Sequence, residues 1–109
     1  MTDRVSDQIL FVLSAPPMLE DQLIDWLLER DEATGFTSLD VNGHSSDPLH
    51  LTVAEKVSGR QRRLQFQVQL PSAALEAFRS GLEQTFAGAG LHYWVLPLLG
   101  AGALASSTD

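Results

Sequence analysis

The chain has 109 residues, a formal net charge of −7 and no cysteine. This length allows one hydrophobic core, and 44% apolar with 19% charged residues is typical of a folded globular chain. The negative balance disfavours general nucleic-acid binding, because phosphate backbones are held mainly by cationic side chains. The lack of cysteine excludes disulfides, thiolate metal sites and cysteine nucleophiles. With neither a secretory signal pattern nor an apolar run of about 20 residues, we expect a cytoplasmic protein without membrane insertion.

The first half of the chain predicts a strand, a helix and a second strand. Residues 8–14 form a short continuous apolar run, which is typical of a central strand covered on both faces. Two prolines then favour a helix start, and a helix is expected over about 18–30. Its apolar stripe at helical spacing comprises Leu19, Leu23, Ile24, Leu27 and Leu28. An alternating strand is expected over 36–41, followed by a turn at Asn42-Gly43, whose residue types tolerate positive φ.

The second half predicts the same order again. Apolar residues alternate with glutamines over 63–70, which indicates a strand with two distinct faces. A second helix is expected to begin at Pro71-Ser72, with Ser72 as its N-cap, and to end at the glycines that follow residue 86. Its buried stripe comprises Leu75, Phe78, Leu82 and Phe86. Residues 91–98 predict the last strand, and Pro97 suits an edge because proline cannot donate to a ladder.

This order of elements predicts an α+β, ferredoxin-like fold: a four-stranded antiparallel sheet with two helices on one face, and a hairpin-like excursion between the second and third strands. We expect a single domain over 1–109, with loose tails at 1–7 and 100–109. The uncovered sheet face should carry the glutamine row or its opposite, together with Leu10, Val12, Trp94 and Leu96. An apolar patch of that size usually marks an interface, so we expect a homo-oligomer whose sheets face inward.

Most of the residues that are suited to binding a ligand lie in or beside the excursion. Residues 49–57 alternate as a hairpin arm would, and two of the three histidines lie in the stretch 35–63. The metal candidates are His44, His50 and His92. Imidazole suits copper and zinc, so a divalent metal of this kind is one candidate cofactor. The spacing matches no known metal motif, and solvated or hydrogen-bonded histidines are the alternative.

Four of the seven Lys and Arg residues also lie between Lys56 and Arg63. The anion candidates are Arg60, Arg62 and Arg63, because guanidinium groups pair with phosphate or carboxylate in bidentate geometry. Alternation places Arg63 on the same side of its strand as the glutamines. An intersubunit salt bridge, or a solvated turn, is therefore the alternative to a ligand site.

Short strings of residues resemble a known superfamily. Gly35-Phe36-Thr37 and Val41-x-Gly43-His44, followed by a loop and a basic lead-in to an alternating strand, resemble the nitrogen-regulatory PII signalling proteins. The string LTVAEKVSGRQRR over 51–63 and the ending Tyr93-Trp94-Val95-x-Pro97 are more closely similar to a small PII-like family of unknown function. Members of that family are often encoded beside heavy-metal efflux pumps.

The resemblance implies a homotrimer of ferredoxin-like subunits that binds ligands in clefts between neighbours. The segment from His44 to Arg62 would be the T-loop, the mobile loop with which PII proteins touch their partners, and Gly43 at its base joins the arginines as a candidate ligand-binding residue. PII proteins hold nucleotide phosphates on a loop rich in glycine and lysine, whereas residues 87–90 here read AGAG. The fold and the trimer are therefore carried over, and ATP binding is not.

These observations favour a trimeric, PII-like signalling protein that binds a metal ion or a small anion. It would report the ligand through the loop to a protein target such as an efflux pump or its regulator. The alternative is a metal-binding protein similar to the CutA-type divalent-cation tolerance proteins. No serine stands at a recognisable spacing from a histidine and an acid, and no GxxxxGK[ST] phosphate loop is present. We therefore do not expect an enzyme.

Overall fold

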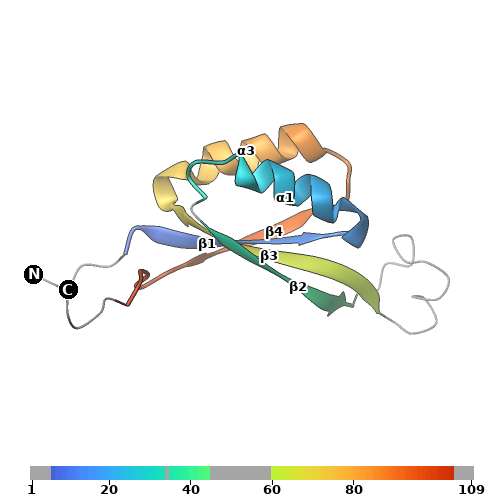
Figure 1. Cartoon of the computed structure of the whole chain (residues 1–109), viewed down its shortest axis with the longest axis horizontal. Coiled ribbons are helices and arrows are strands. Elements are labelled where there is room, and N and C mark those ends of the chain that lie inside the picture. The colour runs from blue at the N-terminus through green and yellow to red at the C-terminus, as the bar shows by residue number, and fades with distance from the viewer. Residues whose placement is uncertain (1–5, 34, 45–59, 105–109) are drawn as a thin grey trace, which may run out of the picture.

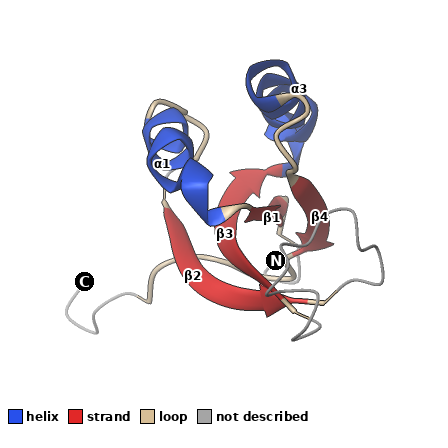
Figure 2. Cartoon of the chain, turned by 90° about the vertical axis from the view of Figure 1, so that its right-hand side faces the viewer, coloured by secondary structure: helices blue, strands red, loops and turns tan. Residues whose placement is uncertain are grey.

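A computed structural model describes residues 6–33, 35–44 and 60–104 of the chain. Its elements in chain order are β1 (Gln8–Ala15), α1 (Glu20–Leu28), β2 (Phe36–Gly43), β3 (Gln61–Pro71), α3 (Leu75–Phe86) and β4 (His92–Pro97). The strands form one antiparallel sheet in the order β2-β3-β1-β4, and both helices lie on the same face of it (Figures 1 and 2). The predicted α+β, ferredoxin-like arrangement is confirmed. No helix in the described part of the chain is long and apolar enough to cross a membrane.

The core lies between the helices and the sheet. On the two central strands Phe11 stands opposite Val68, and Leu13 stands opposite Phe66; all four are almost fully buried. Phe78 of α3 meets Phe11 edge-on, with ring centroids 4.9 Å apart. The buried hydrophobic residues packed together are Ile9, Phe11, Leu13, Ala15, Leu23, Trp26, Leu27, Leu64, Phe66, Val68, Leu70, Phe78 and Leu82. Residues on one face of a strand recur every two positions, and residues on one face of a helix recur about every 3.6 positions. The apolar residues follow this spacing and meet in a single layer, so the sequence pattern predicts this core.

Both helix starts differ from the prediction. A single 3₁₀ turn precedes each helix, over Pro17–Leu19 and Ser72–Ala74. Ser72 was predicted to be an N-cap, and this is wrong: it lies inside the 3₁₀ turn, and its backbone N–H donates to the carbonyl oxygen of Asp7 at 2.8 Å. Leu28, assigned to the buried stripe of the first helix, is instead 70% exposed. Leu28 is the last residue of α1 and directly follows the buried Leu27, so it lies about 100° around the helix from that side chain.

The turn predicted at Asn42-Gly43 is also wrong. Both residues belong to β2, where they pair with Arg62 and Gln61 of β3, and neither has a positive φ. The glycine is explained by close packing, because a Cβ at this position would lie 3.1 Å from Cγ of Arg63. The loop and hairpin arm predicted over 45–57 lie outside the described residues.

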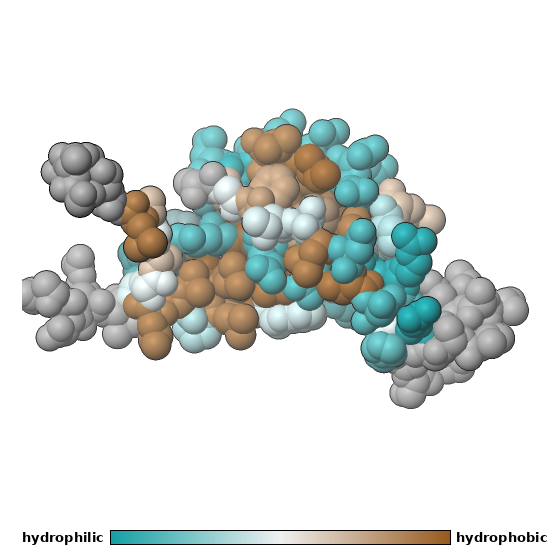
Figure 3. Space-filling view, turned by 60° about the horizontal axis from the view of Figure 1, so that its bottom comes forward, coloured by the Kyte–Doolittle hydropathy of each residue, from teal (hydrophilic) through white to brown (hydrophobic). Residues whose placement is uncertain are grey.

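The uncovered face of the sheet carries the glutamine row and the apolar residues expected there. Val12 stands between Gln67 on β3 and Trp94 on β4, and Leu10 stands between Gln69 and Leu96. This face, which we call the open face, comprises alternate residues of all four strands, namely Gln8, Leu10, Val12, Ser14, Thr37, Leu39, Val41, Gly43, Gln61, Arg63, Gln65, Gln67, Gln69, Pro71, His92, Trp94 and Leu96. Figure 3, which turns the underside of the molecule forward, shows hydrophobic side chains gathered on it.

Candidate functional site at the base of the 45–59 segment

A groove of about 730 Å³ lies at one end of the open face. It is formed where β2 ends and β3 begins, on either side of the segment 45–59, and where the chain enters β4. Four candidates from the sequence line it: Gly43, His44, Arg63 and His92. A ligand in this groove would therefore touch described residues on both sides of the 45–59 segment.

Arg63 is the best-anchored polar residue of the groove. Its Nε donates to Oγ of Ser14, and its Nη2 donates to the carbonyl oxygens of Ser14 and Gly90, each at 2.9 Å. The residue is only 8% exposed, and this burial lowers the pKa of the Arg63 guanidinium from its ordinary value because desolvation disfavours the charged form. Arginine remains protonated in proteins even so. Among the described residues, its guanidinium is thus a buried cation that hydrogen-bonds to neutral oxygens.

Two glycines make this anchoring possible. Gly43 packs against the side chain of Arg63, as described above. Gly90 has a φ of +84°, a left-handed conformation that favours glycine, and in this conformation its carbonyl oxygen accepts from Arg63. Arg63 therefore ties three separate places together: the end of β1, the stem of the 45–59 segment and the connection between α3 and β4.

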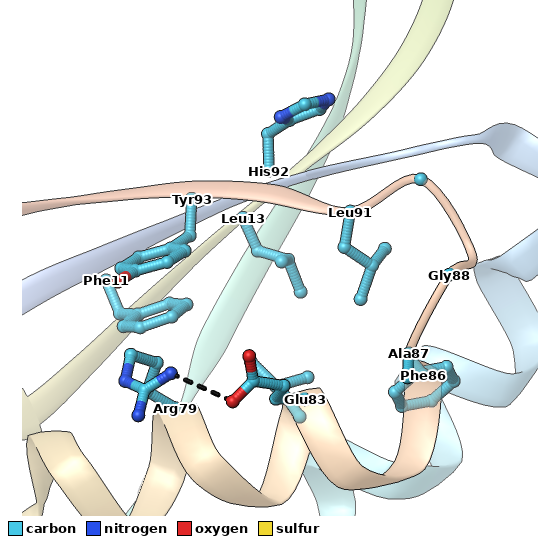
Figure 4. A pocket seen from close by; sticks show the side chains of 12 residues that line it. Phe11, Leu13, Arg79, Glu83, Phe86, Ala87, Gly88, Leu91, His92 and Tyr93 are labelled. Atoms are coloured by element: carbon cyan, nitrogen blue, oxygen red, sulfur yellow. Dashed lines mark hydrogen bonds and ion pairs between the residues drawn. The ribbon is translucent and has the colours of Figure 1, made fainter.

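The structure brings two of the three candidate histidines to the groove. His92 stands opposite Ser14 in the sheet, and Figure 4 shows its side chain on the opposite side of β4 from Tyr93, directed away from α3. His44 follows β2 and lines the same groove, so these two imidazoles share one site. His50 lies outside the described residues. Within the described ranges 6–33, 35–44 and 60–104, no group of three or more His, Asp or Glu residues is placed so that it could hold a metal ion.

The three arginines do not form one cluster. Arg63 lies on the open face, on the side of Gln65 and Gln67 as predicted. Arg62, its neighbour in β3, points to the other side and lines a small hollow with Asp40 and Asn42, to which Arg63 also contributes. Arg60 is exposed and precedes β3. Only Arg63 of the three reaches the groove.

Six further residues line the groove that the sequence did not single out as ligand-binding. They are Ser14, Pro16, Gln61, Gly90, Leu91 and Trp94. Ser14 had a weak signal, because it is the one hydroxyl side chain in an otherwise apolar run of strand residues. Trp94 is 45% exposed, so it offers an aromatic surface beside the imidazole of His92.

Comparison with known proteins gives a family and a fold. A family model described as "Protein of unknown function (DUF3240)" matches residues 5–105. A crystal structure of a DUF3240 family protein from Shewanella baltica OS155 is similar, with a TM-score of 0.76 and 24% sequence identity over 92% of this chain and 99% of that chain. At this identity the likeness is one of fold. No curated protein matches the chain.

Proposed function

The chain belongs to the DUF3240 family of proteins of unknown function, and we propose that it is a PII-like regulatory protein. In this proposal it forms a homotrimer through its open face and binds a small anion in the groove beside Arg63. It then reports the bound anion through the 45–59 segment to a protein target. The observation that carries the proposal is the buried guanidinium of Arg63, whose described partners are all neutral oxygens.

The charge of Arg63 favours an anion over a metal ion in the groove. The hydrogen bonds that Arg63 makes within the described residues use Nε and Nη2, so in that part of the chain the two N–H groups of Nη1 remain for a ligand. Two unit charges 4 Å apart interact by about 4 kcal/mol at a dielectric constant near 20, and a divalent ion doubles that energy. An anion gains this energy and a divalent cation loses it. Gln61, His44 and His92 line the same groove and carry further N–H groups.

A signal from this groove has a short route to the 45–59 segment. His44 lies directly before the segment, and Gln61 follows it by two residues, so one ligand can contact both stems. A ligand that binds one arrangement of the stems better than another shifts the population toward it. An efflux pump or its regulator is the target class that the PII-like resemblance suggests.

The open face has the composition of an interface. The chain carries 14 Asp and Glu residues, yet none stands among the strand positions of this face, where Arg63 is the one Lys or Arg. Interface cores are depleted in charged residues. The glutamines suit a second copy because each amide both donates and accepts; Gln67 already donates to Gln65 at 3.1 Å, and Gln69 to Gln8 at 3.2 Å. The apolar residues Leu39, Trp94 and Leu96, each 43–47% exposed, would be buried with them.

A second candidate function, direct metal binding of the CutA type, draws support from one observation. His44 and His92 line the same groove, and two imidazoles suit copper or zinc. Three subunits would multiply such a pair. The chain would then hold metal itself, without signalling to a protein target.

A thermal-shift screen of inorganic phosphate, hydrogen carbonate, Cu²⁺ and Zn²⁺ tests both functions. A ligand at ten times its Kd adds about 1.4 kcal/mol of stability, which for a chain of this size raises Tm by about 5 °C. We expect such a rise with at least one of the two anions, and a smaller rise in the His92→Ala variant. A rise with Cu²⁺ or Zn²⁺ alone, lost in both His44→Ala and His92→Ala, would instead establish the metal function.

A further inference from the structure

A second hollow, of about 300 Å³, lies on the other side of the sheet from the groove, between α3 and β4 (Figure 4). Its walls are largely apolar and come from both layers of the fold: Phe11, Leu13, Leu82, Phe86, Leu91 and Tyr93. This volume is at the lower end of the range for small-molecule sites, and it suits a single ring with a short substituent.

One wall of the hollow is an aromatic pair that the fold leaves partly uncovered. The rings of Phe11 and Tyr93 are stacked, with centroids 5.1 Å apart and planes within 3° of each other. Phe11 is fully buried, whereas Tyr93 is 49% exposed. Figure 4 shows Tyr93 and Leu91 on the helix side of β4 and His92 on the opposite side. Gly90, Leu91 and His92 line both the hollow and the groove at Arg63, but the aromatic pair lines the hollow alone.

An ion pair between Arg79 and Glu83, which both line the hollow, lies at its mouth. Arg79 of α3 is paired with Glu76 and with Glu83, each at 3.2 Å, so the three side chains together carry a charge of −1. Hydrogen bonds to Glu76 and Glu83 raise the pKa of Arg79, which keeps it charged. Oε1 of Glu83 accepts from Nη1 of Arg79, and its second carboxylate oxygen is left for another donor. Of the two acids, only Glu83 lines the hollow.

We propose that the hollow between α3 and β4 is a binding site for a small organic cation with a flat apolar body. The body would pack between Phe86, Leu82 and the ring of Tyr93, and the cationic group would donate to Glu83 at the mouth. A cation can donate to Glu83 while the ion pair between Glu83 and Arg79 stays intact. An anionic ligand would have to displace Glu83 from Arg79, and it would be repelled by a chain of net charge −7. Aromatic faces also attract cations. None of Glu83, Phe86 and Tyr93 lines the anion groove.

Three ligands of nearly equal size test the proposal: benzylamine, which is a cation, benzyl alcohol, which is neutral, and benzoate, which is an anion. Each is titrated into the full chain and followed by backbone amide chemical shifts. Ligands this small bind weakly, so a Kd of about 1 mM is expected for benzylamine. We expect it to bind at least about 5-fold more tightly than benzyl alcohol, with benzoate weakest. The shifted amides should centre on Leu82, Phe86 and Tyr93.

Two matched variants locate the charge that sets the preference. Glu83→Gln and Glu76→Gln each remove one exposed carboxylate that pairs with Arg79 at 3.2 Å, but only Glu83 lines the hollow. The preference for benzylamine over benzyl alcohol should disappear in Glu83→Gln and persist in Glu76→Gln, while benzyl alcohol binds all three proteins alike. Absence of binding by all three ligands, tighter binding of benzoate, or an unchanged preference in Glu83→Gln would overturn the proposal.

Discussion

Replacing Arg63 with methionine is expected to lower the free energy of unfolding by about 3 kcal/mol. Methionine keeps much of the apolar stem but removes three hydrogen bonds from a charged donor, to Ser14 Oγ, Ser14 O and Gly90 O. Bonds to charged groups contribute about 1.5–3 kcal/mol each. Relief from burying the cation, which belongs to a residue only 8% exposed, offsets part of that loss. The net value is therefore well below the sum of the three bonds.

The matched control is Arg62→Met, one residue earlier in the same strand. Arg62 is exposed and points to the opposite side of β3, so this variant should lose less than about 1 kcal/mol. Urea denaturation of both variants at one salt concentration measures the difference. Equal losses in the two variants would show that the anchoring of Arg63 to Ser14 and Gly90 does not stabilise the fold.

Replacing Leu96 with glutamate is expected to dissociate the proposed trimer, raising its dissociation constant by at least about 100-fold. Leu96 is 47% exposed on the open face, which holds no other carboxylate in its strand positions. In a trimer whose sheets face inward, the substitution would bury three carboxylates near one another. Burial of an unpaired charge costs several kcal/mol, and like charges add repulsion.

Leu104→Glu is the control for this prediction, since it makes the same chemical change at a residue that is 101% exposed and lies beyond the last strand. Sedimentation at micromolar concentration should give three times the 11.9 kDa mass of the chain for wild type and Leu104→Glu, and the mass of one chain for Leu96→Glu. Circular dichroism should be the same for all three. A wild-type protein that sediments as a monomer would remove the trimer from the proposed function.

The elements and the core were predictable because their signals are local. Over β3 the alternation of Leu64, Phe66 and Val68 with glutamines identifies both the strand and its buried face. The errors occurred where a residue's intrinsic preference was overridden by its surroundings. Asn42 and Gly43 favour turns, but the ladder to β3 keeps them extended, and the glycine is needed for contact with Arg63. Ser72 favours an N-cap, but a 3₁₀ turn occupies its position.

The groove could be predicted only in part, because it depends on contacts between distant residues. The sequence singled out Arg63 and both histidines by residue type. It could not show that Arg63 would be buried, because its hydrogen-bond partners lie 49 and 27 residues away, at Ser14 and Gly90. Alternation along β3 did place Arg63 on the side of Gln65 and Gln67, and the structure confirms it.

The most direct test of the anion-binding function is a calorimetric titration of the wild-type chain with inorganic phosphate and with hydrogen carbonate. We predict saturable binding of one of these anions, at one site per chain. The heat should persist in Arg62→Met and fall sharply in Arg63→Met. Absence of heat with both anions, or equal binding by the Arg63→Met and Arg62→Met variants, would contradict a function built on the buried guanidinium of Arg63.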